Sequence, residues 1–194
     1  APSRRPAPEP LRPLTGADGP PPGSLTLPLS EHRQLWLALH LEHPRTLDAI
    51  AALCHRYTPL VSPEPPDALL LEVRGSLRLF GGARVLIERL QADLHKRAIA
   101  ARLALAPTPN AALWLARGQT SSGASSDRCI TVRPESLNRH LASVPVVCLR
   151  WPEEQTRLLD DLAIRTVGEL MRLPREGLAR RLGRQWLLEL DRAL

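Results

Sequence analysis

Residues 68–82 read Ala-Leu-Leu-Leu-Glu-Val-Arg-Gly-Ser-Leu-Arg-Leu-Phe-Gly-Gly, and this stretch decides the fold. Its first six residues form a nearly continuous apolar run, which predicts a buried strand over 68–73. Residues 74–76 are typical of a turn, and residues 77–80 alternate as a short partner strand would. The two glycines then end the second strand. The stretch therefore predicts a β-hairpin inside a sheet.

The flanking segments add strands and helices to this hairpin. Downstream, residues 84–97 carry leucines at helical spacing, residues 102–106 form an apolar strand, and a proline opens a helix over 109–117. Upstream, the run at 35–41 predicts a buried strand, and a helix follows from Thr46 to Cys54. The order β-α-β-β-α-β, followed by a helix, predicts an α+β fold. Its arrangement is ferredoxin-like, with two helices on one face of a four-stranded antiparallel sheet.

The composition changes twice along the chain, which predicts three parts. Residues 1–31 are rich in proline, with nine in the first 30, and predict a disordered tail. Residues 32–149 hold the α+β pattern and include a polar loop over 118–128. Residues 150–194 form a small all-helical segment, and its predicted helices cover residues 152–162, 166–173, 175–182 and 184–194.

Length, composition and charge exclude several classes of protein. The chain has 194 residues, 43% hydrophobic and 24% charged, which rules out disorder throughout. No apolar run approaches the ~20 residues of a membrane span, and three widely spaced cysteines favour a reducing cytoplasm. The net charge of +6 permits a nucleic-acid partner without requiring one. Because no initiator Met is present, we expect a fragment or a processed chain.

Three segments together resemble one known family. Residues 68–82, residues 101–117 (Ala-Arg-Leu-Ala-Leu-Ala-Pro-Thr-Pro-Asn-Ala-Ala-Leu-Trp-Leu-Ala-Arg) and residues 159–174 resemble blocks of the Y-family translesion DNA polymerases. The Leu-Phe-Gly-Gly and Leu-Ala-Leu-Ala-Pro-Thr-Pro forms look most like the ImuB-type, non-catalytic branch. The resemblance implies a polymerase palm over residues 32–149. It also implies the truncated start of a helix-hairpin-helix thumb over residues 150–194.

An active palm of this family needs carboxylates that hold two Mg²⁺ ions, and the resemblance locates their positions here. The first falls at residue 39 or 40 and the second at residue 41 or 42, so Glu42 is the only acid among them. The Asp-Glu pair of the family aligns with Asp67-Ala68, and Glu72 lies further along that strand. Two metal ions require more carboxylates than this. We therefore expect no catalytic residues and no cofactor, with Asp67, Glu72 and Glu42 as residual acids that would use Mg²⁺ if the chain were active.

The thumb-like segment offers candidate DNA contacts. The family binds phosphate through backbone N–H groups of a glycine hairpin, but the matching stretch at 149–153 has no glycine. A later turn keeps the shape and places Arg165 beside Thr166. Arg180, Arg181 and Arg184 surround a glycine and are further candidates for contact with a DNA backbone. The alternative interpretation makes these arginines solvated helix-end charges.

The sequence thus predicts a non-catalytic accessory or adaptor protein in translesion synthesis, damage-induced (SOS) mutagenesis and DNA repair. The resemblance implies weak, sequence-independent DNA contact. It also implies three protein partners, namely an error-prone replicative-type polymerase subunit, a sliding clamp and a RecA-like accessory protein, and no membrane. Two alternatives stay open: an active error-prone Y-family polymerase and a stand-alone DNA-binding module.

Overall fold

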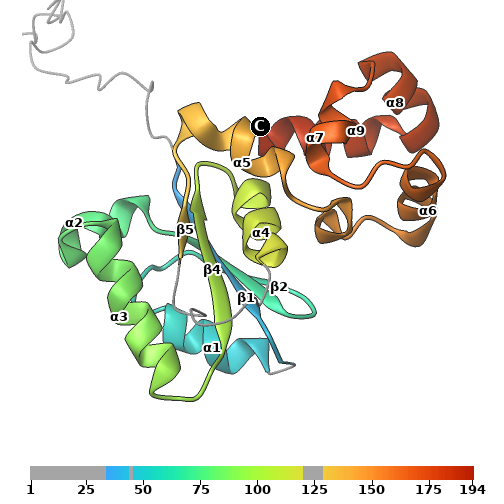
Figure 1. The fold of residues 1–194 in the computed structure, drawn as a ribbon. Helices are drawn as coiled ribbons and strands as arrows, with labels where there is room; N and C mark the ends of the chain where they lie inside the picture. The colour runs from blue at the N-terminus through green and yellow to red at the C-terminus, as the bar shows by residue number, and fades with distance from the viewer. Residues whose placement is uncertain (1–33, 44–45, 120–128) are drawn as a thin grey trace, which may run out of the picture. The chain divides into compact units, whose positions relative to one another are not determined.

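A computed structural model gives the fold and describes residues 34–43, 46–119 and 129–194 (Figure 1). The tail predicted over residues 1–31 and the loop predicted over 118–128, except its first two residues, lie outside the described residues. The elements follow in the order β1 (Trp36–Leu41), α1 (Leu47–Cys54), β2 (Val61–Glu64), β3 (Ala68–Glu72), η1 (Arg74–Ser76), α2 (Leu77–Phe80), α3 (Ala83–His95), β4 (Ala101–Ala106), α4 (Pro109–Gly118), β5 (Ile130–Thr131), η2 (Pro134–Ser136), α5 (Leu137–Ala142), η3 (Val146–Leu149), α6 (Glu153–Asp161), α7 (Val167–Arg172), α8 (Arg175–Leu182) and α9 (Arg184–Ala193).

The sheet has five strands in the order β2-β3-β1-β4-β5, with β1 at its centre. The first four strands are antiparallel to their neighbours, as predicted. The fifth, β5, joins the edge in parallel with β4. The sequence prediction of four strands was wrong on this point, because two residues carry too little periodicity to indicate a strand.

The predicted hairpin was also wrong, because β3 pairs with the strand that precedes it. Its partner is β2, in which Val61 lies opposite Leu71 and Glu64 opposite Ala68. Residues 77–80 instead form the short helix α2, in which Leu79 is 84% exposed. Four residues are too few to distinguish a period of 2 from one of 3.6. Pro63 within β2 concealed this strand, although an edge strand tolerates proline.

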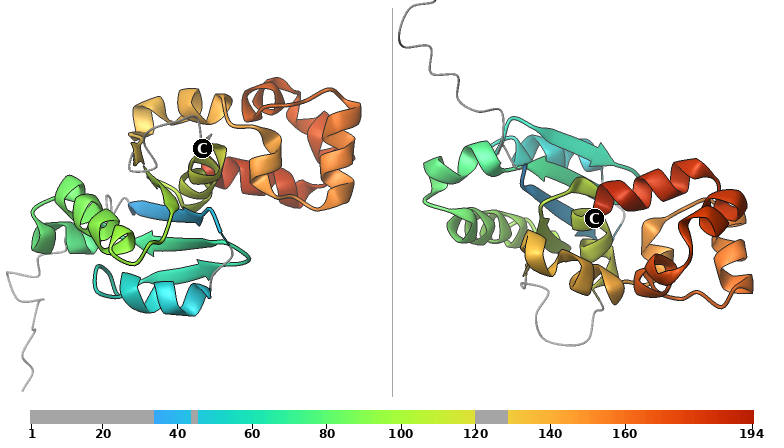
Figure 2. Two further views of the ribbon diagram at one scale, coloured as in Figure 1. Left: turned by 60° about the horizontal axis from the view of Figure 1, so that its bottom comes forward. Right: turned by 90° about the horizontal axis from the view of Figure 1, so that it is seen from above.

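Two helices cover one face of the sheet, and Figure 2 shows them on the side opposite α4. The helices α1 and α3 pack their apolar stripes on leucines of the strands, because alternate residues of a strand point to the same face. The buried side chains on this side include Leu37, Leu39, Leu71, Leu86, Leu90 and Leu103. The predicted helices over 46–54 and 84–97 are confirmed within a few residues.

The other face of the sheet carries α4 and the helices that follow it. Small residues of the sheet, Ala38, Ala104 and Ala106, face the alanine-rich side of α4, which allows close packing around the buried Trp114. The four helices predicted from residue 152 onward are present, and the last returns to α4, where Thr108 Oγ1 donates to the Ala193 carbonyl at 2.9 Å. None of the described helices combines the length and apolar character needed to cross a bilayer.

Candidate functional site

The strands β1 and β3 place His40 and Asp67 together at one end of the sheet. His40 lies opposite Ala68 in the strand register, and the Leu41 N–H donates to the Asp67 carbonyl at 2.8 Å. The family resemblance puts metal-binding carboxylates at position 39 or 40 and at positions 67–68. The fold therefore does bring these aligned positions together, but one of them is a histidine and only one is an acid.

A guanidinium occupies the space beside the Asp67 carboxylate. Arg150 Nη2 donates to Asp67 Oδ2, and His40 Nε2 lies 3.5 Å from the same oxygen. Both side chains are largely shielded from solvent, with Asp67 21% and His40 15% exposed. Asp67 Oδ1 and His40 Nδ1 are buried without a hydrogen-bond partner in the part of the chain described. Asp67 is thus held by a fixed cation from the chain itself.

Glu42 reaches the same end of the sheet and is also paired with an arginine. Its backbone N–H donates to the Ala100 carbonyl at 3.1 Å, which continues the strand pairing past the end of β1. Arg102 Nε donates to Glu42 Oε1 at 3.1 Å, and Arg102 Nη1 also donates to the carbonyl of Gln119 after α4. Glu42 and Arg102 are 25% and 19% exposed. This carboxylate therefore ties β1 to β4.

Glu72 does not join the other two acids. It lies opposite Trp36 at the far end of β3, four strand residues from Ala68, which is on the order of 13 Å at 3.3 Å per residue. Its Oε1 accepts the backbone N–H of Leu35 at 3.2 Å and that of Arg74 at 3.1 Å. Glu72 accepts backbone hydrogen bonds where the strands end, and its role there is structural.

Positive charge exceeds negative charge around Asp67. Arg117 on α4 donates from Nη1 to the Cys148 carbonyl at 3.5 Å, and its Nε is buried without a partner among the described residues. Burial, followed by the nearby Arg150, lowers the pKa of the Arg117 guanidinium. Burial is also the main cause that lowers the pKa of His40, and the surrounding arginines act in the same direction. The site consequently favours a neutral histidine.

The residues present do not fit a two-metal magnesium site. Magnesium requires several oxygen ligands in near-octahedral geometry, and a polymerase centre shares carboxylates between two ions. Here Asp67 and Glu42 each accept a hydrogen bond from an arginine, and arginine offers donors only. Across residues 34–43, 46–119 and 129–194, no three His, Cys, Asp or Glu side chains gather as a metal site would need.

The structure places Arg165 and Thr166 at the start of α7, where they serve the helix itself. Thr166 Oγ1 accepts the Glu169 N–H at 3.3 Å, and Glu169 Oε2 accepts the N–H groups of Arg165 and Thr166 at 2.7 and 3.0 Å. These bonds form a capping box and lower the pKa of Glu169. Arg165 Nη1 also donates to Asp160. The backbone N–H groups of Arg165, Thr166 and Glu169 are therefore taken, and DNA contact here stays a prediction.

Arg180, Arg181 and Arg184 are exposed and flank the turn between α8 and α9. Two belong to the last turn of α8, and the third begins α9 after Gly183, which has φ of +98°. No carboxylate in the described segments forms an ion pair with any of the three. Exposed and unneutralised cations are suited to a phosphate backbone. Their contact with DNA stays a prediction as well.

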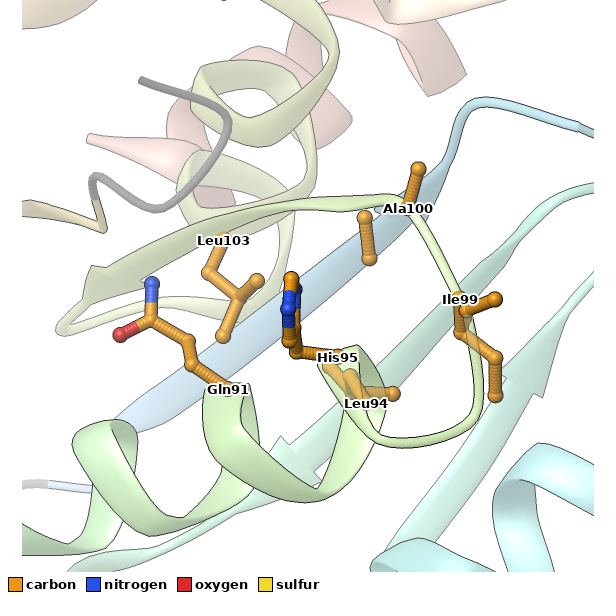
Figure 3. Close-up of a pocket in the computed structure, with 8 residues that line it drawn as sticks. Gln91, Leu94, His95, Ile99, Ala100 and Leu103 are labelled. Carbon is orange, nitrogen blue, oxygen red and sulfur yellow. The ribbon is translucent and has the colours of Figure 1, made fainter.

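A cavity of about 240 Å³ between α3 and β4 contains none of the residues predicted to be functional. Figure 3 shows Gln91 and His95 of α3 beside it, with Leu103 of β4 opposite. Its other lining residues are apolar, and no carboxylate lines it. The cavity therefore offers no acid–base pair or metal ligand set.

Sequence reasoning missed the partner of Asp67. Arg150 precedes α6 with a left-handed backbone, φ +55°, a conformation that favours glycine. The sequence did show that this stretch has no glycine where the family has a glycine hairpin. That substitution was the available signal, but a contact between residues 83 positions apart cannot be inferred from local pattern.

Comparisons with known proteins concern the sequence and the overall fold. No protein-family model matches the chain. Protein ImuB of Caulobacter vibrioides, in two strains, is 33% identical over 148 residues, which cover 76% of this chain and 31% of that protein. Two solved structures, DinB from Sulfolobus solfataricus and the insertion ternary complex of Dbh DNA polymerase, match with a TM-score of 0.58. Each is 17% identical and covers 75% of this chain and 42% of its own.

The two kinds of likeness carry different information. At 17% identity the solved structures establish the fold alone, while the 33% identity to ImuB concerns the sequence itself. The chain spans less than half the length of every protein named above. In sequence and in fold, the described chain is a Y-family-polymerase-like protein of the ImuB type.

Proposed function

We propose that this chain is a non-catalytic, Y-family-polymerase-like accessory protein in translesion DNA synthesis, damage-induced mutagenesis and DNA repair. Its likeness to ImuB and its polymerase fold support a role connected with DNA damage. One observation carries the non-catalytic part of the proposal. Arg150 of the chain fills the space beside Asp67, where a metal-binding carboxylate would need to be accessible.

The chemistry of nucleotidyl transfer explains why this observation matters. Two divalent cations neutralise the attacking and the leaving oxygens and position both for in-line displacement. A guanidinium carries positive charge but has no coordination positions for a substrate oxygen. With Arg150 on Asp67 and Arg102 on Glu42, both carboxylates support the structure of the sheet end. This arrangement suits a scaffold that holds its partners.

The finer assignment of the fold belongs to the same proposal. The order β-α-β-β-α-β over residues 36–106, with strand order β2-β3-β1-β4, supports a ferredoxin-like palm. The short, closely connected helices α6 to α9 support a helix-hairpin-helix thumb that begins at residue 150. We place the boundary between the two parts between Leu149 and Arg150.

The proposed partners follow from the resemblance. DNA is the first, bound weakly and without sequence preference, and the likeness to Dbh, a DNA polymerase, supports it. An error-prone polymerase subunit, a sliding clamp and a RecA-like protein are the others, and we propose the cytoplasm as the place where they meet.

Primer extension tests the catalytic part of the proposal. The purified chain is incubated with primed template, undamaged or lesion-containing, and nucleotides with Mg²⁺ or Mn²⁺, beside an active Y-family polymerase as positive control. We expect no incorporation above a protein-free blank. Incorporation that disappears when Glu42→Ala and Asp67→Ala are combined would establish the active-polymerase alternative instead.

A further inference from the structure

Three cations surround a single carboxylate where α1 and α3 end. Asp93 Oδ2 lies 2.9 Å from Arg56 Nη1, and Asp93 Oδ1 lies 4.0 Å from both Lys96 Nζ and Arg97 Nη1. The carboxylate is 15% exposed, whereas the three cations are 62%, 74% and 46% exposed. One negative charge cannot neutralise three positive ones, so two positive charges remain in excess at the surface.

The core of the protein holds Asp93 in place. Tyr57 Oη lies 2.8 Å from Asp93 Oδ2, and the Tyr57 ring is buried and stacks on Phe80 with centroids 5.5 Å apart. The hydrogen bond from Tyr57 lowers the pKa of Asp93, which keeps the carboxylate ionised. Arg97 Nη1 also donates to the Asp93 carbonyl at 2.9 Å. The cations are thereby positioned by a rigid group, while their side chains remain 46–74% exposed.

A fourth cation extends the cluster along α3. The exposed Arg89 lies one turn before Asp93, with its Cζ 5.8 Å from the centroid of the Phe80 ring. Residues 89, 93 and 96–97 share one face of the helix, because they are spaced by three or four positions. From Arg89 to Lys96 the helix rises about 10 Å at 1.5 Å per residue. This length corresponds to roughly three phosphates of one duplex strand at about 3.4 Å each along the axis.

We propose that this row of cations, the α3 basic face, binds the phosphate backbone of nucleic acid; it consists of Arg56, Arg89, Lys96 and Arg97. It lies on the layer of α1 and α3, which covers one side of the sheet, whereas α4 covers the other (Figure 2). The side chains of His40 and Asp67 belong to the cluster that includes Arg117 of α4 and Arg150. The α3 basic face is therefore a nucleic-acid contact separate from the residual palm site and from the thumb arginines.

Helix-end charge alone does not explain this arrangement. Lys96 and Arg97 follow the last turn of α3, where cations complement the helix dipole. Arg56 follows the end of α1 in the same way, but Arg89 lies within α3, where no helix end accounts for it. Three of the four cations are arginines, whose planar donors match phosphate oxygens in pairs. Four cations beside one carboxylate leave an excess of three positive charges, which fits a polyanion.

Binding of a labelled DNA duplex by the whole chain, measured by fluorescence anisotropy across salt concentrations, tests the proposal. The variant Arg56→Ala, Lys96→Ala, Arg97→Ala should reduce the slope of log K against log salt by about 2 to 3, since each lost phosphate contact contributes about 0.9. The control is Arg84→Ala, Arg157→Ala, Arg175→Ala, which removes the same charge from cations that each have one acidic partner. The control should change the slope by less than about 1.

A second variant guards against unfolding, and a competitor tests the class of partner. Arg89→Ala, Lys96→Ala leaves the contacts among Arg56, Tyr57 and Asp93 intact and should still reduce the slope by about 1 to 2. Equal slopes for these variants and the control would overturn the proposal. Polyglutamate that displaces DNA as well as unlabelled DNA of equal charge would overturn it too, because the face would then recognise acidic protein.

Discussion

The guanidinium of Arg150 donates to the carboxylate of Asp67 across 83 residues of sequence. The aspartate comes just before β3, and the arginine lies in the turn that leads to α6. The pair therefore joins the end of the sheet to the beginning of the helical segment. It also engages Asp67, the one acid present where the family has its Asp-Glu pair.

Removal of Arg150 should destabilise the fold. In Arg150→Ala, Asp67 loses its only ion-pair arginine and keeps His40 at 3.5 Å and the more distant Arg117, while its Oδ1 already lacks a partner among the described residues. Loss of the hydrogen-bonded partner of a shielded charge costs about 1 to 3 kcal/mol, the lower end being expected because Arg150 is 34% exposed and Arg117 remains nearby. Urea unfolding measures the difference. In the matched control, Arg157→Ala, the exposed pair with Glu153 should contribute at most about 0.5 kcal/mol, and equal losses would contradict the prediction.

His40 should make stability depend on pH below its ordinary pKa of 6.5. Burial lowers the pKa of His40 in the folded chain, so in this range the unfolded state binds more protons than the folded state. Its stabilising contribution is complete above pH 6.5 and is lost as the pH falls toward the folded-state pKa. The groups that face it are Asp67, which opposes the shift, and Arg102, Arg117 and Arg150, which reinforce it. Unfolding of the wild type and of His40→Gln between pH 5 and 7 should show a flatter profile in the variant; parallel profiles would refute this.

Two helical glycines should respond in opposite directions to alanine. A Cβ on Gly168 of α7 would lie 2.8 Å from the Ala142 carbonyl oxygen and 2.9 Å from the Ala142 Cβ, too close for any packed pair. Gly168→Ala should therefore cost about 1 to 3 kcal/mol by forcing α5 and α7 apart. A Cβ on Gly177 of α8 would meet nothing within 4 Å, so Gly177→Ala should stabilise the chain by about 0.5 to 1 kcal/mol. Thermal denaturation of both variants checks the contrast, and destabilisation of similar size in both would contradict it.

The thumb arginines can be tested separately from the α3 basic face. Arg180→Ala, Arg181→Ala, Arg184→Ala should lower the salt slope of DNA binding by up to about 2.7 if all three meet phosphate. Arg165→Ala should have little effect, because Arg165 already pairs with Asp160. The measurement is the same anisotropy titration on duplex DNA. An unchanged slope in the triple variant would make these arginines helix-end charges only.

Much of the fold could be predicted because its central elements are long and strongly apolar. The runs at 35–41, 68–73 and 102–106 became β1, β3 and β4, since strands buried on both faces need continuous apolar residues. Local pattern failed where an element was short or at an edge. The four residues of α2 alternate as a strand would, although they form a helix. Pro63 argued against a strand at β2, but β2 lies at the edge of the sheet, where a proline need not break a hydrogen bond to a neighbouring strand.

The candidate site could be predicted in part. The scarcity of acids at the aligned positions is visible in the sequence, and so is the distance along the strand that separates Glu72 from Asp67. The arginine partners of these acids are not visible in the sequence, because Arg150 lies 83 residues from Asp67 and Arg102 lies 60 residues from Glu42. The Arg150 pairing depends on how the helical segment returns to the sheet, and the Arg102 pairing depends on β4 lying beside β1. No periodicity within either element carries that information.

The cation beside Asp67 is bonded to the polypeptide, and this has a consequence for the cell. A dissolved metal ion dissociates from its ligands when its free concentration falls. The guanidinium of Arg150 is covalently part of the chain, so its contact with Asp67 does not depend on any free concentration. A chelator, or a shortage of free magnesium, should leave the junction between sheet and helices as it was. The protein would then keep its shape in conditions that empty the centres of metal-dependent enzymes.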